Sequence, residues 1–395
     1  MASPQRPEAS QVSLRHALKA TLLAASLSAG VLASGCGGTS APSGPYLPGG
    51  DGAYVNSLYP TLEQYGMFGI KDGAVVPAEG VVPYELNTPL FSDYTVKYRT
   101  VWMPKGKSVA YDVANALDFP LGTIITKSFG FRDDLRKASP SIKWVETRVF
   151  VKQDAGWKGV SYAWNDAQTA AAVNYGGGAV PVSWTDEAGA RIDLDYVVPN
   201  GNQCTLCHSK RDPVTGTDVT TLIGPKIRNF NRDVNRDHAG VSGNQNQLAV
   251  WVSLGLLTGA PADLGTAPKL ANWTDPSATV AQRARAYLDV NCAHCHSEKG
   301  FARTTGLYLD VTETRGSSLG FCKPPVAVGE ASGGFLYDVV PGDPDHSILT
   351  YRLASTAASV MMPQIGRGVV DKAGTQLVRD WVTGLKGTTQ DCLGR

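Results

Sequence analysis

Two short motifs in the sequence hold residues that together can attach a redox cofactor. Each has two cysteines separated by two residues and followed at once by a histidine: the first motif is Cys204-Thr205-Leu206-Cys207-His208 and the second is Cys292-Ala293-His294-Cys295-His296. Two thiols at this spacing reach the two vinyl groups of one porphyrin, and the adjacent histidine is then held beneath the iron, which is the attachment pattern of c-type haem. In a chain with 7 cysteines and 6 histidines, roughly 0.002 such matches are expected by chance, so two of them predict two covalently bound haem c groups.

Paired C-x-x-C segments also occur in zinc ribbons and in dithiol oxidoreductases. A zinc ribbon separates its pairs by about 15 to 20 residues, whereas Cys207 and Cys292 lie much farther apart, and the two histidines would have no role. A thioredoxin-like pair is disfavoured because neither motif stands between a strand and a helix. The predicted haem-binding residues are therefore Cys204, Cys207 and His208 for the first haem, and Cys292, Cys295 and His296 for the second.

The N-terminus has the layout of an export signal. Arg6, Arg15 and Lys19 precede an apolar and small-residue run that ends directly before Cys36. Small residues before a cysteine resemble the lipobox of bacterial lipoproteins, so we expect residues 1–35 to be a lipoprotein signal peptide and Cys36 to carry lipid. Ordinary cleavage that leaves Cys36 as a free thiol is the alternative. Because covalent haem is assembled outside the cytoplasm, the two motifs agree with export.

The rest of the sequence must supply the elements that position the two motifs. Residues 36–53 are rich in Gly, Ser and Pro, which predicts a flexible tether. Residues 54–200 have the alternating apolar pattern of a β-rich domain, with expected strands at 123–129, 143–152, 160–164 and 191–198. We divide the remainder into a first haem region, 201–275, with an expected helix over 245–257, and a cytochrome c domain, 276–395.

Two helices are expected around the second motif. Thr279 and Gln282 stand at capping-box spacing at the start of a helix that runs straight into Cys292. Asp371 can cap a last helix whose apolar residues share one face. This pair of helices resembles the single-haem fold of small soluble cytochromes c. We therefore expect an α+β multidomain protein: an N-terminal antiparallel β domain, then mainly α-helical c-type haem regions, the last with a class I cytochrome c-like fold.

The resemblance to small cytochromes c implies a methionine ligand for the second iron, in the loop before the last helix. Met362 stands directly before Pro363, as in the family pattern, and is preferred over Met361. Ligation by His296 and Met362 would raise the reduction potential and suit electron transfer. The alternative is that both methionines fill the apolar core.

The first haem lacks such a candidate, because no methionine occurs between residues 104 and 360. Its distal position could be taken by a histidine, by a methionine from the N-terminal region, or by water. His238 lies in a polar stretch that favours a solvated loop, His294 is expected at the surface, and His346 is expected at a helix entry. Met67 and Met103 are the other candidates.

Cys322 and Cys392 are left after these assignments. In an oxidising compartment we expect them to form a disulfide, and the loop-entropy model then gives more than about 4 kcal/mol for a loop of about 70 residues. Two free thiols are the alternative. With Cys36 lipidated and four cysteines attached to haem, the disulfide leaves none of the seven cysteines unassigned.

Four further segments carry a resemblance over nearly all of the mature chain. They are residues 87–93, 198–203, 322–326 and 340–344. Their order resembles a family of uncharacterised bacterial dihaem c-type cytochromes, which implies the same architecture. Segments 119–123 and 157–162 also resemble the β-sheet cytochromes that crosslink haem to lysine and oxidise hydroxylamine. That resemblance implies a catalytic first haem linked to Lys127 or Lys152, and a scaffold or docking role for the β-rich domain is the alternative.

The overall charge gives no reason to expect nucleic acid binding, because the 395 residues include 36 basic and 35 acidic side chains. We expect an exported dihaem cytochrome in the periplasm or cell envelope, anchored to a membrane through its lipid, that transfers electrons between protein redox partners. Two alternatives remain open. One is an enzyme, peroxidase-like or a small-molecule oxidase, in which the second haem feeds an open first haem. The other is an electron-accepting subunit of a periplasmic dehydrogenase.

Overall fold

The computed structural model describes residues 58–71, 74–138, 141–235, 243–387 and 391–392. All of these belong to one compact unit, Pro42–Arg395. The predictions for the signal peptide, for lipid on Cys36, for the tether and for His238 fall outside the described residues. None of the helices in the described part combines the length and apolar character that crossing a bilayer requires.

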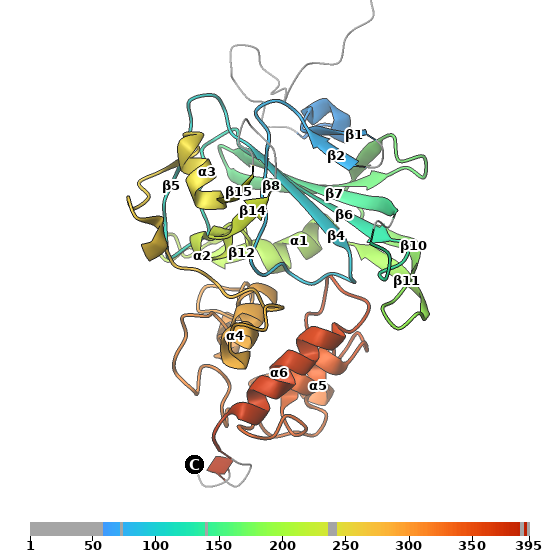
Figure 1. Cartoon of the computed structure of the whole chain (residues 1–395). Helices are drawn as coiled ribbons and strands as arrows, with labels where there is room; N and C mark the ends of the chain where they lie inside the picture. The colour runs from blue at the N-terminus through green and yellow to red at the C-terminus, as the bar shows by residue number, and fades with distance from the viewer. Residues whose placement is uncertain (1–57, 72–73, 139–140, 236–242, 388–390, 393–395) are drawn as a thin grey trace, which may run out of the picture. The chain divides into compact units, whose positions relative to one another are not determined.

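A six-stranded antiparallel sheet is the largest sheet among the described residues (Figure 1). Its strands follow the order β3 (Val82–Pro83), β4 (Val96–Trp102), β6 (Ile124–Arg132), β7 (Ile142–Gln153), β8 (Gly156–Trp164) and β9 (Ala171–Asn174). The predicted strands 123–129, 143–152 and 160–164 correspond to β6, β7 and β8. The predicted strand 191–198 is β11 (Arg191–Val198), which pairs with β10 (Gly178–Thr185) in a separate hairpin. Another hairpin joins β1 (Phe68–Lys71) to β2 (Ala74–Pro77).

The two faces of the six-stranded sheet pack into different cores. Successive side chains of a strand point to opposite faces, so the neighbours Ile124 and Ile125 on β6 fall into separate clusters. Ile124 packs with the 3-10 helix η1 (Leu62–Tyr65) and with Met67. Ile125 packs with Phe150 and with apolar residues that follow the first motif. The second face therefore looks toward the region of the first motif.

The region of the first motif is not mainly α-helical, and here the predicted fold class is wrong. Short strands alternate with short helices: α1 (Gly201–His208), β12 (Ser209–Arg211), β13 (Asp218–Thr220), α2 (Ile227–Phe230), β14 (Asp233–Asn235), β15 (Asn244–Asn246), α3 (Gln247–Ser253), β16 (Leu257–Thr258) and the 3-10 helix η2 (Leu264–Thr266). Gly216 and Gly255 adopt φ of 65° and 69°, a conformation that ends regular elements. The predicted helix 245–257 is shorter for the same reason, since it starts after the cap residue Asn246 and stops before Gly255.

The region of the second motif also has less helix than predicted. Its helices α4 (Val280–Asn291), α5 (Ile348–Ala354) and α6 (Lys372–Gly384) are separated by long irregular stretches with the 3-10 turns η3 (Arg303–Thr305) and η4 (Gly329–Ser332). Glycines and prolines are frequent between α4 and α5. In a helix interior a glycine costs about 1 kcal/mol of stability and a proline about 3 kcal/mol. The described chain is therefore rich in β-strand, not a β domain followed by mainly α-helical haem regions.

The helix starts around the second motif are confirmed. Thr279 and Gln282 form a capping box at the start of α4, and the Asp371 carboxylate accepts a hydrogen bond from the Gly374 amide at the start of α6, at 2.9 Å. The two helices pack in one apolar core. Gly374 permits their close approach, because a Cβ atom there would lie 2.3 Å from the ring of Tyr287 on α4.

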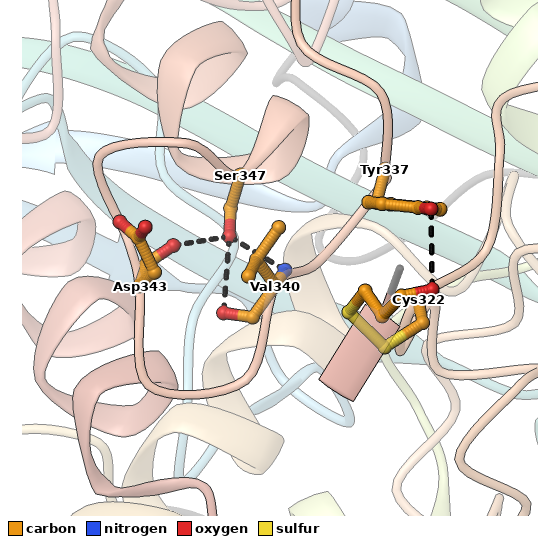
Figure 2. Close-up of a disulfide and its surroundings, with 6 residues drawn as sticks. Cys322, Tyr337, Val340, Asp343 and Ser347 are labelled. Atoms are coloured by element: carbon orange, nitrogen blue, oxygen red, sulfur yellow. Dashed lines mark hydrogen bonds between the residues drawn. A yellow bond between two sulfur atoms is a disulfide. The ribbon is translucent and has the colours of Figure 1, made fainter. Parts of the chain in front are cut away.

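The predicted disulfide between Cys322 and Cys392 is present (Figure 2). Cys392 is buried at 2% exposure, and its carbonyl accepts a hydrogen bond from the Tyr337 hydroxyl at 3.3 Å. Nearby, the Ser347 hydroxyl donates to the Asp343 carbonyl at 2.7 Å. The bond ties the end of the chain to the irregular segment that follows the second motif.

Segment 87–93 connects three parts of the structure. Asn229, in α2, exchanges two hydrogen bonds with the backbone of this segment, at 2.9 and 3.1 Å. The side chain of Asn291, at the end of α4, accepts a third from the same backbone at 2.8 Å. Asp93 accepts from two amides in the loop after Met362, at 2.7 and 3.0 Å. One segment of the β-rich part thus fixes the regions of both motifs.

Candidate cofactor site

The first motif lies on α1, a helix with a well-formed start. Asn200 and Gln203 form its capping box: the Asn200 side chain accepts from the Gln203 amide at 2.9 Å, and the Gln203 side chain accepts from the Asn200 amide at 3.0 Å. Residues three apart share a helix face, so Cys204 and Cys207 lie one turn apart on the same side. His208 is the last residue of the helix.

His208 is oriented as a metal-ligating histidine would be. Its Nδ1 lies 2.8 Å from the carbonyl oxygen of Thr221, and because that oxygen can only accept, Nδ1 carries the proton and Nε2 keeps its lone pair. Burial lowers the pKa of His208 to about 4, so the ring is neutral. The ring of Phe150 packs on it, with the ring centres 4.7 Å apart. Gly159, opposite Phe150 on β8, makes room for that ring, since a Cβ atom there would lie 2.7 Å from it.

A cavity opens beside the first motif. Its volume is about 150 Å³, which is smaller than the roughly 300 to 1,000 Å³ of common small-molecule pockets. Cys204, Cys207 and His208 line it together with apolar side chains of the sheet, of α4 and of the Met362 loop, among them Phe150, Val290 and Ile365. Apolar walls, two thiols and a neutral histidine are the lining chemistry that a covalently held porphyrin needs.

The two motifs touch each other, although the chain separates them widely. Ligand atoms of Cys207, His294 and Cys295 all lie within 4.8 Å of one another. The thiol of Cys295 also donates to the Leu206 carbonyl at 3.4 Å. Hydrogen bonding from Cys295 and then from His294 lowers the pKa of the Cys207 thiol to about 4, while the hydrogen bond to Cys207 raises the pKa of Cys295. Cys207 is the thiolate acceptor of this cluster.

His294 is not a surface residue, so that expectation is wrong. Its side chain is 8% exposed, and its Nδ1 is buried without a hydrogen-bond partner in the described chain. His294 also lines the cavity of the first motif. The physical reason is that the turn after α4 carries it toward Cys207, a contact between distant segments that no local pattern encodes.

The second motif is enclosed by apolar packing. Cys292, at the end of α4, is 9% exposed and belongs to the core shared by α4 and α6, and burial raises the pKa of its thiol to about 12. Burial lowers the pKa of His296 to about 4, and its Nδ1 is buried without a hydrogen-bond partner in the described part. A neutral histidine with an unused nitrogen is suited to ligate a metal.

Met362 is half-buried in a loop whose backbone is fixed. The Met362 amide donates to the Arg352 carbonyl at 3.1 Å, and the buried guanidinium of Arg367 donates to the Met362 carbonyl at 2.8 Å. Neither Met362 nor His296 is among the residues that line the cavity. The cavity therefore belongs to the first motif.

The other distal candidates for the first motif lie elsewhere. Met67 is 1% exposed in the core on the opposite face of the sheet, and Met103 is buried in the core of the first-motif region. His346 has an exposed side chain whose Nδ1 lies 2.7 Å from the Asp343 carboxylate. None of the three lines the cavity within the described chain. Of the two lysines named with the first haem, Lys127 lines the cavity, whereas Lys152 pairs with the exposed Asp118 at 2.8 Å.

Sequence reasoning named Lys127 only as a lysine that could be linked to haem, and it missed the group of cations in the cavity wall to which Lys127 belongs. Arg99, Lys127 and Arg148 come from β4, β6 and β7 and all line the cavity. The signal that could have found them is a charged residue at an inward-facing position of each strand, between buried apolar residues. In a sheet packed on both faces such a position must serve a buried partner.

Comparison of the chain with protein-family models, with curated proteins and with solved structures finds no match. What can be said of its function therefore depends on the motifs and on the geometry around them.

Proposed function

We propose that this protein is a dihaem c-type cytochrome that transfers electrons between redox partners. The observation that carries the proposal is the contact between the motifs: each has the full set of residues for covalent haem attachment, and the attachment atoms of Cys207 and Cys295 lie within 4.8 Å of each other. Two groups attached there would be close enough to exchange electrons directly. A pair of redox centres in contact serves electron transfer better than two isolated ones.

The geometry of His208 supports the first attachment site. Its hydrogen bond to the Thr221 carbonyl fixes the ring and leaves Nε2 free, as is usual for histidines that bind metals. Cys204 and Cys207 on the adjacent turn would form the thioethers, and the apolar walls of the cavity would exclude water. When bound, the iron porphyrin supplies the one-electron chemistry, and this chain supplies burial and axial ligands.

For the second site we propose His296 and Met362 as axial ligands. Arg367 and Arg352 hold the Met362 backbone in place, so the thioether is held in a fixed loop. Replacing Met362 with alanine should abolish the sulfur-to-iron absorption band near the red end of the spectrum. Met361→Ala is the matched control and should leave that band intact, and an unchanged band in the Met362 variant would overturn this assignment.

The test of the whole proposal is the mass of the mature protein from a host that exports and matures c-type cytochromes. We expect the polypeptide plus two haems. Cys204→Ala with Cys207→Ala should remove one haem, and Cys292→Ala with Cys295→Ala should remove the other. The control Cys322→Ala with Cys392→Ala keeps both, because these two residues form the disulfide. A wild-type mass equal to the polypeptide alone would refute the proposal.

The proposal includes export to the periplasm or cell envelope and a lipid anchor on Cys36. We expect Cys36→Ser to move the protein from the membrane fraction to the soluble fraction while both haems are retained.

An electron carrier should have two low-spin haems whose absorption spectra do not change when cyanide or peroxide is added. An altered spectrum of the first haem would instead favour the enzymatic alternative, and co-purification with a periplasmic dehydrogenase would favour the subunit alternative.

The Cys207, His294 and Cys295 cluster supports a second candidate, a site for a soft divalent cation such as Zn²⁺. Two thiols and an imidazole with ligand atoms within 4.8 Å are a common zinc donor set that leaves one position open. Metal analysis of the purified protein separates the candidates. Stoichiometric zinc that is lost in His294→Ala, in protein without haem, would favour this one.

A further inference from the structure

A row of three cations crosses the sheet beneath the cavity. Arg99 on β4 stands opposite Lys127 on β6, and Lys127 stands opposite Arg148 on β7. Directly opposed residues share one face of a sheet, and like charges at such positions are destabilising. With strands about 4.8 Å apart, the row extends roughly 10 Å along the cavity floor. Such a row persists only if something compensates its charge.

Within the described chain, the protein compensates one end of the row only. The Glu146 carboxylate pairs with Arg148 at 2.6 Å and also accepts hydrogen bonds from Ser161 at 2.8 Å and Tyr196 at 2.5 Å. Both carboxylate oxygens of Glu146 are therefore already engaged as hydrogen-bond acceptors. Burial would lower the pKa of Arg148, but the Glu146 charge prevails and raises it.

The other two cations are not compensated in this way. Arg99 is 7% exposed, and its Nη2 is buried without a hydrogen-bond partner among the described residues. The Lys127 ammonium lies 4.7 Å from the centre of the Phe129 ring. In the described part of the chain no acidic side chain forms an ion pair with either of them, and the only acidic charges that act on them are those of Glu85 on Arg99 and of Glu146 on Lys127. A buried cation without a counter-charge is costly.

The remaining charges around the cavity do not remove this excess. Arg367 lines the cavity as a further cation, and Lys97 adds another on the same sheet face as Arg99. The Asp371 carboxylate caps α6, and Asp93 holds the loop after Met362. Asp93 is thus committed to backbone amides, whereas Asp371 lines the cavity and its Oδ2 is buried without a hydrogen-bond partner among the described residues, so this one carboxylate offsets at most one of the cations in the cavity wall.

We propose that Arg99, Lys127 and Arg148 form a carboxylate-binding row. Its ligand is either the propionates of a porphyrin held at Cys204 and Cys207, which rests on the proposed function, or a free organic acid admitted to the cavity, which does not. Both sources offer the same chemistry: anionic oxygens that accept charge-assisted hydrogen bonds from guanidinium and ammonium groups. The row carries the charge that such a ligand needs, and it lies where the cavity can deliver one.

The test compares the purified full-length protein with Arg99→Gln and Lys127→Gln variants, using succinate as the probe. Tryptophan fluorescence and, where haem is present, the Soret band are followed during titration at constant ionic strength. A saturable succinate response that becomes about tenfold weaker in each variant supports the row and assigns it to a free acid. The other supporting outcome is that the wild type shows no succinate response and that the first haem of both variants has a lower reduction potential than in the wild type. The row is then assigned to propionates.

Two sets of controls keep this test decisive. Arg99→Lys and Lys127→Arg retain the charge and should retain the wild-type behaviour. Lys97→Gln removes a cation from the same face but outside the cavity lining and should have a smaller effect than either row variant. Row variants that match the wild type in both succinate response and potential overturn the inference. Haem content is measured by mass on the same samples, so a protein without haem that still binds succinate through the row refutes the proposed function alone.

Discussion

Strands surround the first motif with charged and aromatic side chains, whereas helices surround the second motif with apolar ones. Lys127, Arg148 and Phe150 face the cavity of the first motif. Cys292 of the second motif lies instead in the α4 and α6 core, with Trp381 and Leu377. Identical attachment residues are thus placed in two environments of different polarity.

If the proposed function is right, this difference gives the two motifs different tasks. Fixed charges beside a redox centre shift its potential, and an open cavity admits ligands, whereas an apolar enclosure with a methionine loop favours a centre that only exchanges electrons. On the proposed function, the first site is the one that a partner or small molecule can influence, and the second is the insulated relay. The predictions below test how far the two environments are independent, in order of decreasing effect.

The largest expected effect comes from the buried ion pairs that join the two regions. Asp289 on α4 is 1% exposed and lies 2.8 Å from Arg228 of α2 and 3.6 Å from Lys226. Asp289→Ala leaves the buried Lys226 without this counter-charge and leaves Arg228 with Asp310 alone, at 3.5 Å, so we expect a loss of about 3 to 5 kcal/mol in the free energy of unfolding. Denaturant unfolding followed by fluorescence measures it.

The matched control is the exposed pair of Glu298 and Arg315, whose side chains are 66% and 59% exposed. Glu298→Ala should cost at most about 1 kcal/mol. If Asp289→Ala costs no more than this control, the two regions are not coupled through α4 and the ion pairs contribute only locally.

The disulfide lies within the region of the second motif. It closes a loop with a sequence separation of 70, for which loop entropy predicts about 4 kcal/mol and removal of native bonds typically costs about 2 to 5. Cys322→Ala, Cys392→Ala and the double variant should lose the same stability, because each removes the same bond. Additive losses in the double variant would contradict the bond. A thermal scan with and without reductant provides an independent measurement.

Local signals in the sequence were sufficient for the helix starts and for the main strands. Thr279 with Gln282 and the cap at Asp371 depend only on neighbours within four residues. The strand periodicity of β6 and β7 is visible because apolar residues such as Ile124, Val149 and Val151 recur on one face. The fold class failed because the glycine-rich stretches after both motifs have no such local signal. Their backbone is satisfied by hairpins and by long-range contacts that propensity does not encode.

The candidate site was predictable only in its covalent chemistry. The spacing of the motif residues identifies what His208 can bind, but not that Thr221 orients it. The burial of His294 and the row that begins at Arg99 depend on which strand lies opposite which, and this is decided by tertiary pairing. A buried polar contact between distant segments cannot be predicted until the pairing register of the strands is known.

A smaller effect is expected at the crossing of α4 and α6, which has no counterpart near the first motif. Gly374→Ala would place a Cβ atom 2.3 Å from the Tyr287 ring, so the helices must separate, at a cost of about 1 to 3 kcal/mol. Gly384→Ala, in the same helix, meets nothing within 4 Å and should be neutral or stabilising by roughly 0.5 to 1 kcal/mol. Urea unfolding of the pair measures the difference, and equal stabilities would contradict close packing of the helices.

The smallest expected effect is a difference between the two motif helices in their response to loss of the N-terminal cap. Asn200→Ala and Thr279→Ala each remove a cap worth about 1 kcal/mol. No residue of α1 is fully buried, whereas α4 has seven buried residues in its core. The lost cap of α4 should therefore lower global stability, while that of α1 should raise local amide exchange in 201–208 and leave global unfolding almost unchanged. Hydrogen exchange alongside denaturant unfolding distinguishes these outcomes. An equal global loss in both variants would mean that α1 unfolds only with the whole protein, and the contrast between an adjustable first site and a rigid second one would then fail.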